Sequence, residues 1–330
     1  MHLLPAFNLQ HHNAHDAKTR PSHGFLMKCA VCFLLVFVGY NISNVSSIDT
    51  AREALARSAQ EETIVRDDQP PVCRVQFVFT GSKYNYAQFP TLQSWIRYTD
   101  SKCVIEFILA NHPFMTQLTP AHARMFYESD YLPILQADML KMFAVYYLGG
   151  LAVDLDVEAL KPFPSQWIGP DTALATCDVV LGIERDCYDN NCLSSWRMRR
   201  KGQIQNWAMY ARKPRSTFFG ELLDFTVDRY ERFHVPHGPN ATVEVQEIAG
   251  SGVITDFVQL FGNFSKPLHL SETSPQGPSL VSDKTSVLRI KKNGEEVCIV
   301  GSRYTGFQCS QWPECILHHH YEGSWKTPSP

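Results

Sequence analysis

The chain has 330 residues, of which 44% are hydrophobic and 12% aromatic, and its formal net charge is −3. This length allows one large domain with extra segments or two modest domains, with enough apolar residues for a sizeable core. The slightly acidic balance, with no long basic run, excludes a broad nucleic-acid-binding surface and indicates small molecules or neutral polymers as partners.

The first element along the chain is an apolar segment at residues 25–40, FLMKCAVCFLLVFVGY. It is short for a membrane span, which needs about 20 apolar residues, so a cleaved signal peptide and an uncleaved signal-anchor are both open. The anchor is favoured because the polar, basic stretch ahead of it is long for a signal peptide and no small-x-small cleavage site follows. Positive charge before the span keeps that end cytoplasmic. We therefore expect a cytoplasmic tail over 1–24, a transmembrane helix over 25–40, a stem over 41–72 and a lumenal domain over 73–330.

Two further features agree with a lumenal domain. The short span in addition suits the thinner membranes of the early secretory pathway. We therefore expect a single-pass type II protein of the Golgi membrane. Glycosylation acceptor triplets begin at Asn41, Asn44, Asn240 and Asn263. Eight of the ten cysteines lie outside the apolar segment, and an even set fits disulfides, with Cys187/Cys192 and Cys309/Cys315 as close candidates. The full connectivity stays open, and the absence of a CxxC pair argues against zinc.

The folded domain is expected to begin near Cys73 with a buried strand, RVQFVFTG. A helix through SWIRY and a second strand, CVIEFILAN, follow. This alternation predicts an α/β layered domain with a mostly parallel, mixed sheet flanked by helices. Ligands of such sheets bind at the carboxyl ends of the strands.

A helix ending in a glycine pair is predicted ahead of the strongest functional signal. Apolar residues recur at the spacing of one buried helix face, at Leu140, Phe143, Ala144 and Tyr147. Asp138 and Lys141 fall on a different face of this helix. Gly149-Gly150 suits the left-handed conformation that ends a helix.

The functional signal itself is the sequence LAVDLDVEA after the glycine pair. In a strand, alternate side chains share a face, so Asp154, Asp156 and Glu158 are expected together. Adjacent carboxylates repel one another unless a cation or substrate offsets the charge, which predicts a metal site. Mg²⁺ and Mn²⁺ bind carboxylate and phosphate oxygens together, as the diphosphate of a sugar nucleotide requires.

An Asp-x-Asp pair alone is weak evidence, but its surroundings resemble the family of glycosyltransferases with a DXD-containing sugar-binding region. The matching elements are Ala137-Asp138, Gly149-Gly150, Asp154-x-Asp156 and Lys161-Pro162. The family includes fungal α-1,6-mannosyltransferases and inositol-phosphoceramide mannosyltransferases. The resemblance implies a glycosyltransferase A-type nucleotide-binding fold, with Mn²⁺ or Mg²⁺ as cofactor.

The same resemblance implies roles for the site residues. Asp138 would bind the donor sugar, Asp154 the ribose and sugar, and Asp156 the metal, with Asp154 and Asp156 the catalytic pair. Lys141, which stands where the family commonly has Arg, would also bind the donor, and Ala152 stands where the family has an aromatic. Lysine keeps the charge of arginine but loses its bidentate fork.

Three later segments extend the resemblance. In QIQNWAMYARKP, Gln205 and Asn206 would face the donor or acceptor sugar, the alternative being an ordinary strand with Trp207 in the core. In AGSGVITDF, Thr255 and Asp256 are expected to cap the following helix or to take part in catalysis. In LHHHYEGSW, His320 would complete the metal shell, and Ser324 and Trp325 would donate hydrogen bonds to the diphosphate. A basic cluster, Arg197, Arg199, Arg200 and Lys201, is expected to be a solvated loop.

The resulting prediction is a metal-dependent, retaining hexosyltransferase acting on a glycan, with mannose from GDP-mannose as the first candidate donor. An α-1,6-mannosyltransferase of protein N-glycosylation is the leading assignment, and an inositol-phosphoceramide (glycolipid) mannosyltransferase or other hexosyltransferase is the alternative. A haloacid-dehalogenase-like phosphatase also uses Asp-x-Asp, but it places the pair near the start of its domain and needs later motifs that this sequence lacks. A non-catalytic, sugar-binding relic is the remaining hypothesis. No nucleophile is evident in the sequence.

Overall fold

The computed structural model describes residues 73–78, 80, 91–234, 245–270, 286–307 and 309–321, all within one compact unit, Arg57–Pro330. The predicted tail, apolar segment and stem, the acceptors Asn41, Asn44 and Asn240, and Ser324 and Trp325 lie outside these residues. Within the described residues, none of the helices combines the length and apolar character that crossing a membrane requires.

The elements alternate between strand and helix over most of the chain. In order they are β1 (Cys73–Val78), α2 (Thr91–Tyr98), β2 (Cys103–Ile108), η2 (Pro113–Gln117), α3 (Pro120–Tyr127), α4 (Pro133–Leu148), β3 (Gly150–Val153), β4 (Val157–Ala159), β5 (Val179–Gly182), α5 (Asn190–Trp196), β6 (Ala208–Ala211), α6 (Thr217–His234), α7 (Val245–Ile248), α8 (Ser251–Phe261), β7 (Val287–Lys292), β8 (Glu295–Val300), α9 (Ser302–Thr305), η4 (Cys309–Gln311) and β9 (Leu317–His319). The predicted first strand, helix and second strand correspond to β1, α2 and β2.

Seven strands form the main sheet in the order β2-β1-β3-β6-β5-β8-β7, and β4 pairs with β9 in a separate two-stranded sheet. The pairs β1–β2, β1–β3 and β5–β8 are parallel, whereas β3–β6, β5–β6 and β7–β8 are antiparallel. The sheet is therefore evenly mixed rather than mostly parallel. Because β6 is antiparallel to both of its neighbours, β3 and β5 run in the same direction and end at the same edge of the sheet.

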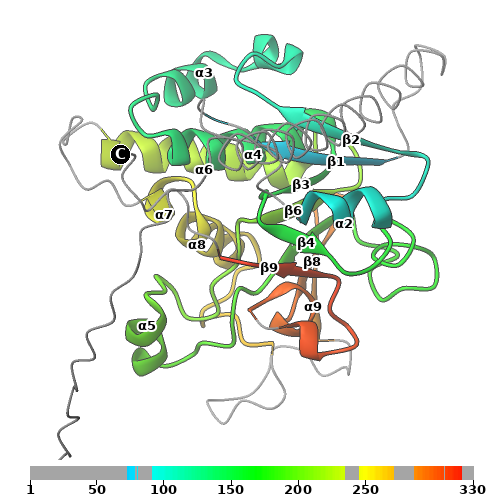
Figure 1. The fold of residues 1–330 in the computed structure, drawn as a ribbon. Coiled ribbons are helices and arrows are strands. Elements are labelled where there is room, and N and C mark those ends of the chain that lie inside the picture. Colours follow the sequence, from blue (N-terminus) through cyan, green and yellow to red (C-terminus); the bar gives the residue numbers. More distant parts are fainter. Residues whose placement is uncertain are drawn as a thin grey trace, which may run out of the picture. The chain divides into compact units, whose positions relative to one another are not determined.

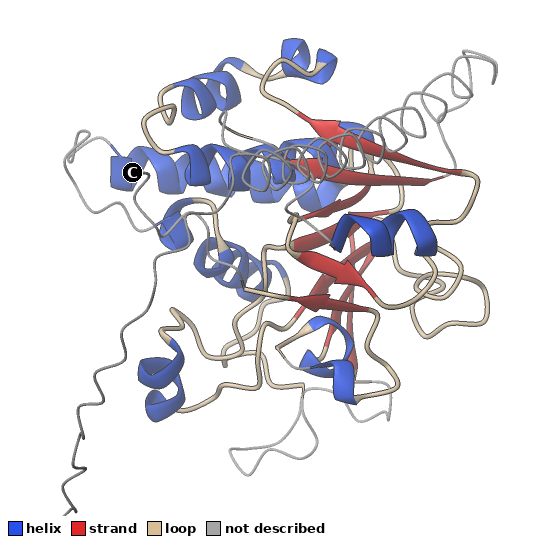
Figure 2. Ribbon diagram, viewed as in Figure 1, coloured by secondary structure: helices blue, strands red, loops and turns tan. Residues whose placement is uncertain are grey.

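Hydrophobic clusters cover both faces of the sheet, and helices lie on both sides of its strands (Figures 1 and 2). Helices α3, α4, α6 and α8 pack on one face, where Ala152 and Met209 are fully buried. On the other face Leu151 and Val153 meet α2 and the segment around Trp167. The alternation along β3 gives each face its apolar side chains, so the strand is buried on both sides and holds its carboxyl end in a fixed place.

Helix α4 is joined to β3 by a sharp turn at two glycines. Pro133 stands in its first turn, and Gly149 and Gly150 follow it with φ of 69° and 83°. A side chain at Gly150 would lie 2.7 Å from Cβ of Arg74, so glycine is required here for both conformation and space. The predicted apolar face of α4 is confirmed, and the face that carries Asp138 and Lys141 is buried as well.

Four disulfides link the eight cysteines of the described residues: Cys73–Cys103, Cys177–Cys298, Cys187–Cys192 and Cys309–Cys315. The last two confirm the pairs predicted from spacing. Cys73–Cys103 joins neighbouring strands β1 and β2, and Cys177–Cys298 ties the start of β5 to β8. The disulfides therefore cross-link the sheet as well as closing local loops.

Candidate active site

The Asp-x-Asp pair lies in a turn at the carboxyl end of β3. The strand ends at Val153, the amide of Asp154 donates to the carbonyl of Trp207 at 2.9 Å, and the amide of Val157 donates to the carbonyl of Asp154 at 3.1 Å. The turn interrupts the strand periodicity, so the prediction that Glu158 shares a face with Asp154 and Asp156 is wrong. Glu158 belongs to the next strand, β4.

Asp154, Asp156 and His319 form a candidate metal site, since one ligand atom of each lies within 4.8 Å of the others. Nε2 of His319 lies 3.2 Å from Oδ1 of Asp156. The indole of Trp207 stacks on the imidazole, with ring centroids 4.5 Å apart and planes 2° from parallel. Trp207 thereby fixes the orientation of the histidine that faces the carboxylates.

The histidine of the candidate metal site is His319 and not His320, which the sequence predicted. His319 is the last residue of β9 and His320 follows it; adjacent side chains of an extended chain point to opposite faces, so only one of the two reaches Asp156. His320 instead lies against Glu158, with Nε2 3.0 Å from Oε2, and its backbone amide donates to the carbonyl of Asp156 at 2.9 Å. The side chain of His320 is thus part of a neighbouring pair rather than of the candidate metal site.

Lys141 ties the two predicted donor-binding carboxylates together. Its ammonium lies 2.7 Å from Oδ1 of Asp154 and 3.0 Å from Oδ1 of Asp138, and only 2% of its side chain is exposed. Burial lowers the pKa of Lys141, but the carboxylates of Asp138 and Asp154 raise it by more, so the ammonium stays charged. Burial raises the pKa of Asp154, which Lys141 partly opposes. Asp138, Lys141, Asp154, Asp156 and His319 are called the carboxylate cluster below.

Asp138 is the most deeply buried carboxylate of the cluster. Burial raises its pKa to about 6, against the opposing charge of Lys141 and a hydrogen bond from Asn206. A Cβ on Gly250 would lie 3.3 Å from Oδ2 of Asp138, so the glycine lets the backbone before α8 approach the carboxylate closely. The structure therefore brings Asn206 to the predicted donor site.

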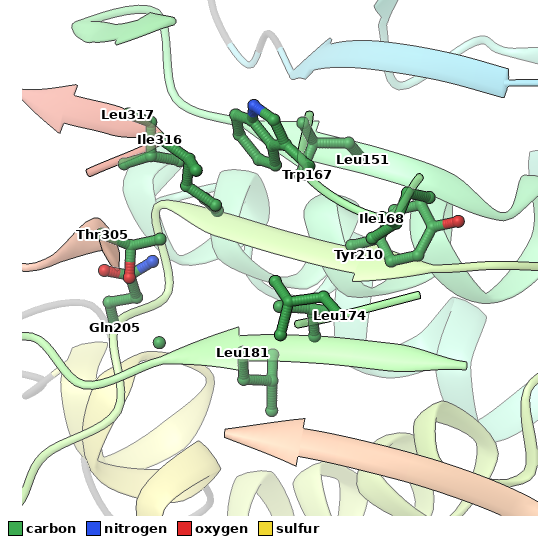
Figure 3. A pocket seen from close by; sticks show the side chains of 13 residues that line it. Leu151, Trp167, Ile168, Leu174, Leu181, Gln205, Tyr210, Thr305, Ile316 and Leu317 are labelled. Carbon is green, nitrogen blue, oxygen red and sulfur yellow. The ribbon is translucent and has the colours of Figure 1, made fainter. Parts of the chain in front are cut away.

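Gln205, the other residue predicted to face the sugar, does not lie with Asn206 and Asp138. Its side chain is buried with Thr305 beside an apolar cavity lined by residues that include Leu151, Trp167 and Tyr210 (Figure 3). Oε1 of Gln205 and Oγ1 of Thr305 lack a protein partner there. Adjacent side chains diverge where the chain enters β6, and this sends Asn206 toward Asp138 and Gln205 to the cavity.

Thr255 and Asp256 do not cap a helix, because α8 begins at Ser251 and both residues lie in its second turn. Asp256 instead binds Arg200 at 2.7 Å and Arg229 at 2.6 Å. Arg200 also reaches Glu247 at 2.7 Å, so the expectation of a solvated basic loop is wrong for this arginine. Arg200, Arg229, Glu247 and Asp256 are called the arginine cluster below.

Sequence reasoning missed Glu184, which lies just beyond the end of β5. Its Oε2 accepts a hydrogen bond from Nε2 of Gln203 at 2.7 Å. Burial raises the pKa of Glu184, and the charge of His319 opposes this rise. A carboxylate directly after the buried run VVLGI is the signal that would have identified it, since ligands bind at the carboxyl ends of strands.

The cluster suits a hard divalent cation. Two carboxylates and one imidazole supply ligands that Mn²⁺ and Mg²⁺ accept, and three protein ligands leave positions for diphosphate oxygens and water. Nδ1 of His319 and Nε1 of Trp207 are buried without a protein partner, so polar atoms remain at the site for further ligands. Asp154, Asp156 and His319 would hold the ion.

Comparison with known proteins gives one family match and two structural likenesses. Residues 86–174 match the family described as glycosyltransferase sugar-binding region containing DXD motif. The chain is similar to the PaToxG glycosyltransferase (16% identity, TM-score 0.37, 68% of this chain and 80% of that chain) and to mouse xyloside xylosyltransferase 1 in its apo form (10%, 0.35, 78% and 99%). Both TM-scores are too low to identify a shared fold, and a search of the curated proteins found no match.

The family match covers α2 through the segment after β4, and so includes Asp138, Asp154 and Asp156. The geometry agrees with it independently, since the Asp-x-Asp pair stands at the carboxyl end of a central strand with a histidine and a lysine in contact. Residues 86–174 therefore match a glycosyltransferase sugar-binding region containing a DXD motif, and this match makes glycosyl transfer the activity to test.

Proposed function

We propose that this protein is a divalent-metal-dependent glycosyltransferase of the A-type fold that moves a hexose from a nucleoside diphosphate sugar to a glycan acceptor. The observation that carries the proposal is the convergence of Asp154, Asp156 and His319 within 4.8 Å at the carboxyl end of β3, with Lys141 and Asp138 beside them. This arrangement combines a cation site with a charged sugar-binding region, as transfer from a diphosphate leaving group requires.

The residues of the site have separate roles in binding the cation and the donor. Asp154, Asp156 and His319 would hold the cation, which neutralises the charge of the departing diphosphate when bound. Lys141 keeps Oδ1 of Asp154 in place, and its second contact fixes Asp138. Asp138 and Asn206 offer an acceptor and a donor for sugar hydroxyls. Positioning and charge stabilisation then supply the catalysis.

The finer assignment rests on sequence resemblance. We propose retention of anomeric configuration, GDP-mannose as the first donor to test, and an α-1,6 linkage on protein N-glycans, with a glycolipid acceptor as the alternative within the class. Lysine at position 141 is the departure most relevant to donor choice, because it acts as a point charge where arginine would present a fork.

We also propose that the domain works in the lumen of the secretory pathway, as a Golgi protein. Four disulfides favour an oxidising compartment. The acceptor Asn263 is exposed in a turn after α8, where a lumenal enzyme would be open to glycosylation.

The deciding experiment is transfer by the purified protein across GDP-mannose, UDP-glucose, UDP-galactose and UDP-N-acetylglucosamine, with Mn²⁺ and after chelation. We expect transfer or slow hydrolysis of one donor that requires the metal and is lost in Asp156→Ala. Full turnover in chelator, or full activity of Asp156→Ala, contradicts the mechanism. Phosphate release from simple phosphomonoesters would favour a phosphatase, and sugar nucleotide binding without turnover a non-catalytic relic.

A further inference from the structure

The carboxyl ends of β3 and β5 bring a second acidic group to the edge where the Asp-x-Asp pair lies. Asp154 follows Val153 at the end of β3, and Glu184 follows Gly182 at the end of β5 by two residues. The two strands run in the same direction with β6 between them. The electrostatic effect of His319 lowers the pKa of both Asp154 and Glu184, in agreement with the strand order, which places Glu184 at the sheet edge that carries the candidate metal site.

Glu184 is held by a rigid partner. Oε1 of Gln203 accepts hydrogen bonds from the backbone amides of Arg199 and Arg200, at 2.8 and 3.1 Å. These bonds fix the amide group, so its Nε2 points at Glu184 and donates at 2.7 Å. A carboxylate oriented by an amide that is itself fixed loses little entropy when it binds a ligand.

A polar chain joins Glu184 to the donor side of the site. The Ser251 hydroxyl donates to Oδ1 of Asn206 at 3.4 Å, and Ser251 also acts to lower the pKa of Glu184. Asn206 in turn hydrogen-bonds to Asp138. Glu184 and Asp138 are thus the two acidic ends of one row of polar side chains, with Ser251 and Asn206 between them.

Glu184 has no full charge partner among the described residues, since none of their cations lies within ion-pair distance of it. It is only half-buried, and burial raises its pKa despite the hydrogen bond from Gln203. A carboxylate offers about four lone-pair positions, of which the hydrogen bond from Gln203 occupies one. An oriented carboxylate with acceptor capacity to spare at a polar site is typical of a group that binds hydroxyls.

We propose that Glu184 is a sugar-binding carboxylate, which accepts hydrogen bonds from hydroxyl groups of the transferred hexose and so sets the position of its anomeric carbon. This inference rests on the proposed glycosyl transfer and adds the residue that faces Asp138 from the opposite end of the row. Gln203 acts through Glu184 and is a positioning residue.

The test compares Glu184→Gln with the wild type, with Glu106→Gln as the control. Glu106 is also a half-buried glutamate of the main sheet, but it pairs with Arg74 at 2.9 Å on β1 and β2, away from the site. Each protein is assayed for Mn²⁺-dependent binding of GDP and UDP, for transfer from the donor that the wild type uses, and for melting temperature.

We expect Glu184→Gln to lose roughly 10- to 100-fold in kcat/KM, the effect of one hydrogen bond to a charged group, with nucleoside diphosphate binding and melting unchanged. Glu106→Gln should keep the wild-type kcat/KM. Equal losses of nucleoside diphosphate binding and of transfer in Glu184→Gln, or no loss of transfer, would overturn the proposal. A wild type that binds neither GDP nor UDP with Mn²⁺ would instead refute the proposed function.

Donor analogues that each lack one hydroxyl identify the contact itself. One of them should reduce wild-type kcat/KM by the factor that Glu184→Gln loses with the intact donor. With Glu184→Gln that analogue and the intact donor should react alike. If every analogue is discriminated equally by both proteins, Glu184 does not touch the sugar.

A Gln203→Ala variant separates binding from positioning. We expect it to lose less in kcat/KM than Glu184→Gln, and we expect the double variant to lose no more than Glu184→Gln alone. Additive losses would show that Gln203 acts independently of Glu184 and would contradict the positioning role.

Discussion

Two groups of charged side chains flank the start of α8, and they differ in how completely their charges are paired. Gly250, just before α8, lies against Asp138 of the carboxylate cluster, and Asp256 within α8 belongs to the arginine cluster. The carboxylate cluster sets three acids against one lysine and one histidine. The arginine cluster sets two acids against two arginines, with Arg200 bidentate to both Asp256 and Glu247.

This difference indicates which of the two groups is suited to bind a cation. In the arginine cluster each charge has its partner, so the assembly is complete and its role is to hold α7 and α8 against the segment before β6. In the carboxylate cluster three acids stand close together, and a divalent cation held by Asp154, Asp156 and His319 would offset their mutual repulsion. Charge density alone would not separate the two groups, but charge balance does.

The largest expected effect comes from removing one carboxylate from each group. Asp156→Asn should lower kcat/KM by about 10³-fold, because it removes a ligand of a cation that supplies several kcal/mol of stabilisation to the leaving group. Its stability should be unchanged or slightly higher, since a repulsive charge is gone. Activity and urea unfolding, measured on the same preparations, check this.

Asp256→Asn should show the reverse, losing about 2–3 kcal/mol of unfolding free energy because Arg200 and Arg229 lose their shared partner. Its kcat/KM per folded molecule should stay within a few-fold of wild type. If Asp256→Asn lost activity as strongly as Asp156→Asn without unfolding, the division between the two groups would be wrong.

The second comparison removes the cations. Lys141→Met should cost about 3 kcal/mol of unfolding free energy, because the buried Asp138 and the half-buried Asp154 then lose the ammonium that they share. Arg200→Met should cost about 2 kcal/mol, less because its side chain is 28% exposed. Mn²⁺ should restore much of the stability of Lys141→Met and none of that of Arg200→Met, as measured by thermal unfolding with and without the metal.

Lys292→Met serves as the surface control, since the side chain of Lys292 is 42% exposed and its ammonium lies 3.8 Å from Oε2 of Glu221. Its unfolding free energy should change by less than about 0.5 kcal/mol. Equal recovery of Lys141→Met and Arg200→Met with Mn²⁺ would mean that the cation binds elsewhere.

The third comparison uses the two neighbouring histidines. His319→Ala should weaken Mn²⁺ binding at least roughly tenfold, because the imidazole that faces Asp156 is lost. His320→Ala should bind Mn²⁺ within about twofold of wild type, since its ring lies against Glu158 and its contribution through the backbone amide remains. Titration of Mn²⁺ by calorimetry distinguishes them. A larger loss in His320→Ala would restore the ligand first expected from sequence.

Much of this site could be predicted from sequence because its signals are local. The spacing of apolar residues in α4, the glycine pair with positive φ and the Asp-x-Asp after a buried strand each depend on a few adjacent residues. The turn at Asp154 was missed because strand periodicity was extended past Val153, where the chain no longer pairs with β6. That error placed Glu158 with the carboxylates.

The remaining misses depend on partners far away in the chain. Which histidine faces Asp156 is decided by the register of β9 on β4, and the register of a strand pair separated by about 160 residues cannot be read from the pattern LHHH. The sequence around Asp256 is that of a helix cap, but packing of α6 against α8 brings Arg229 to it, and Arg200 reaches it from the segment before β6. Glu184 carries no motif, and only the strand order places it beside Asp154.

The smallest expected effect is a difference in how the two groups respond to acid, measured on metal-free protein. Burial raises the pKa of Asp138 to about 6, so unfolding releases its proton between about pH 4 and pH 6. The unfolding free energy from Asp138 therefore falls as the pH rises through this window. Arg200 and Arg229 hold the pKa of Asp256 below its ordinary value despite burial, so its contribution is present above about pH 4 and is lost as the pH falls further.

Urea unfolding in chelator from pH 3 to pH 7 should reveal both trends, each on the order of 1 kcal/mol. Asp138→Asn should flatten the profile between pH 4 and pH 6, and Asp256→Asn should flatten it below pH 4. Identical profiles for the two variants would show that the clusters titrate as one unit. Opposite slopes would instead support the view that the carboxylate cluster is strained without its cation while the arginine cluster is stable by itself.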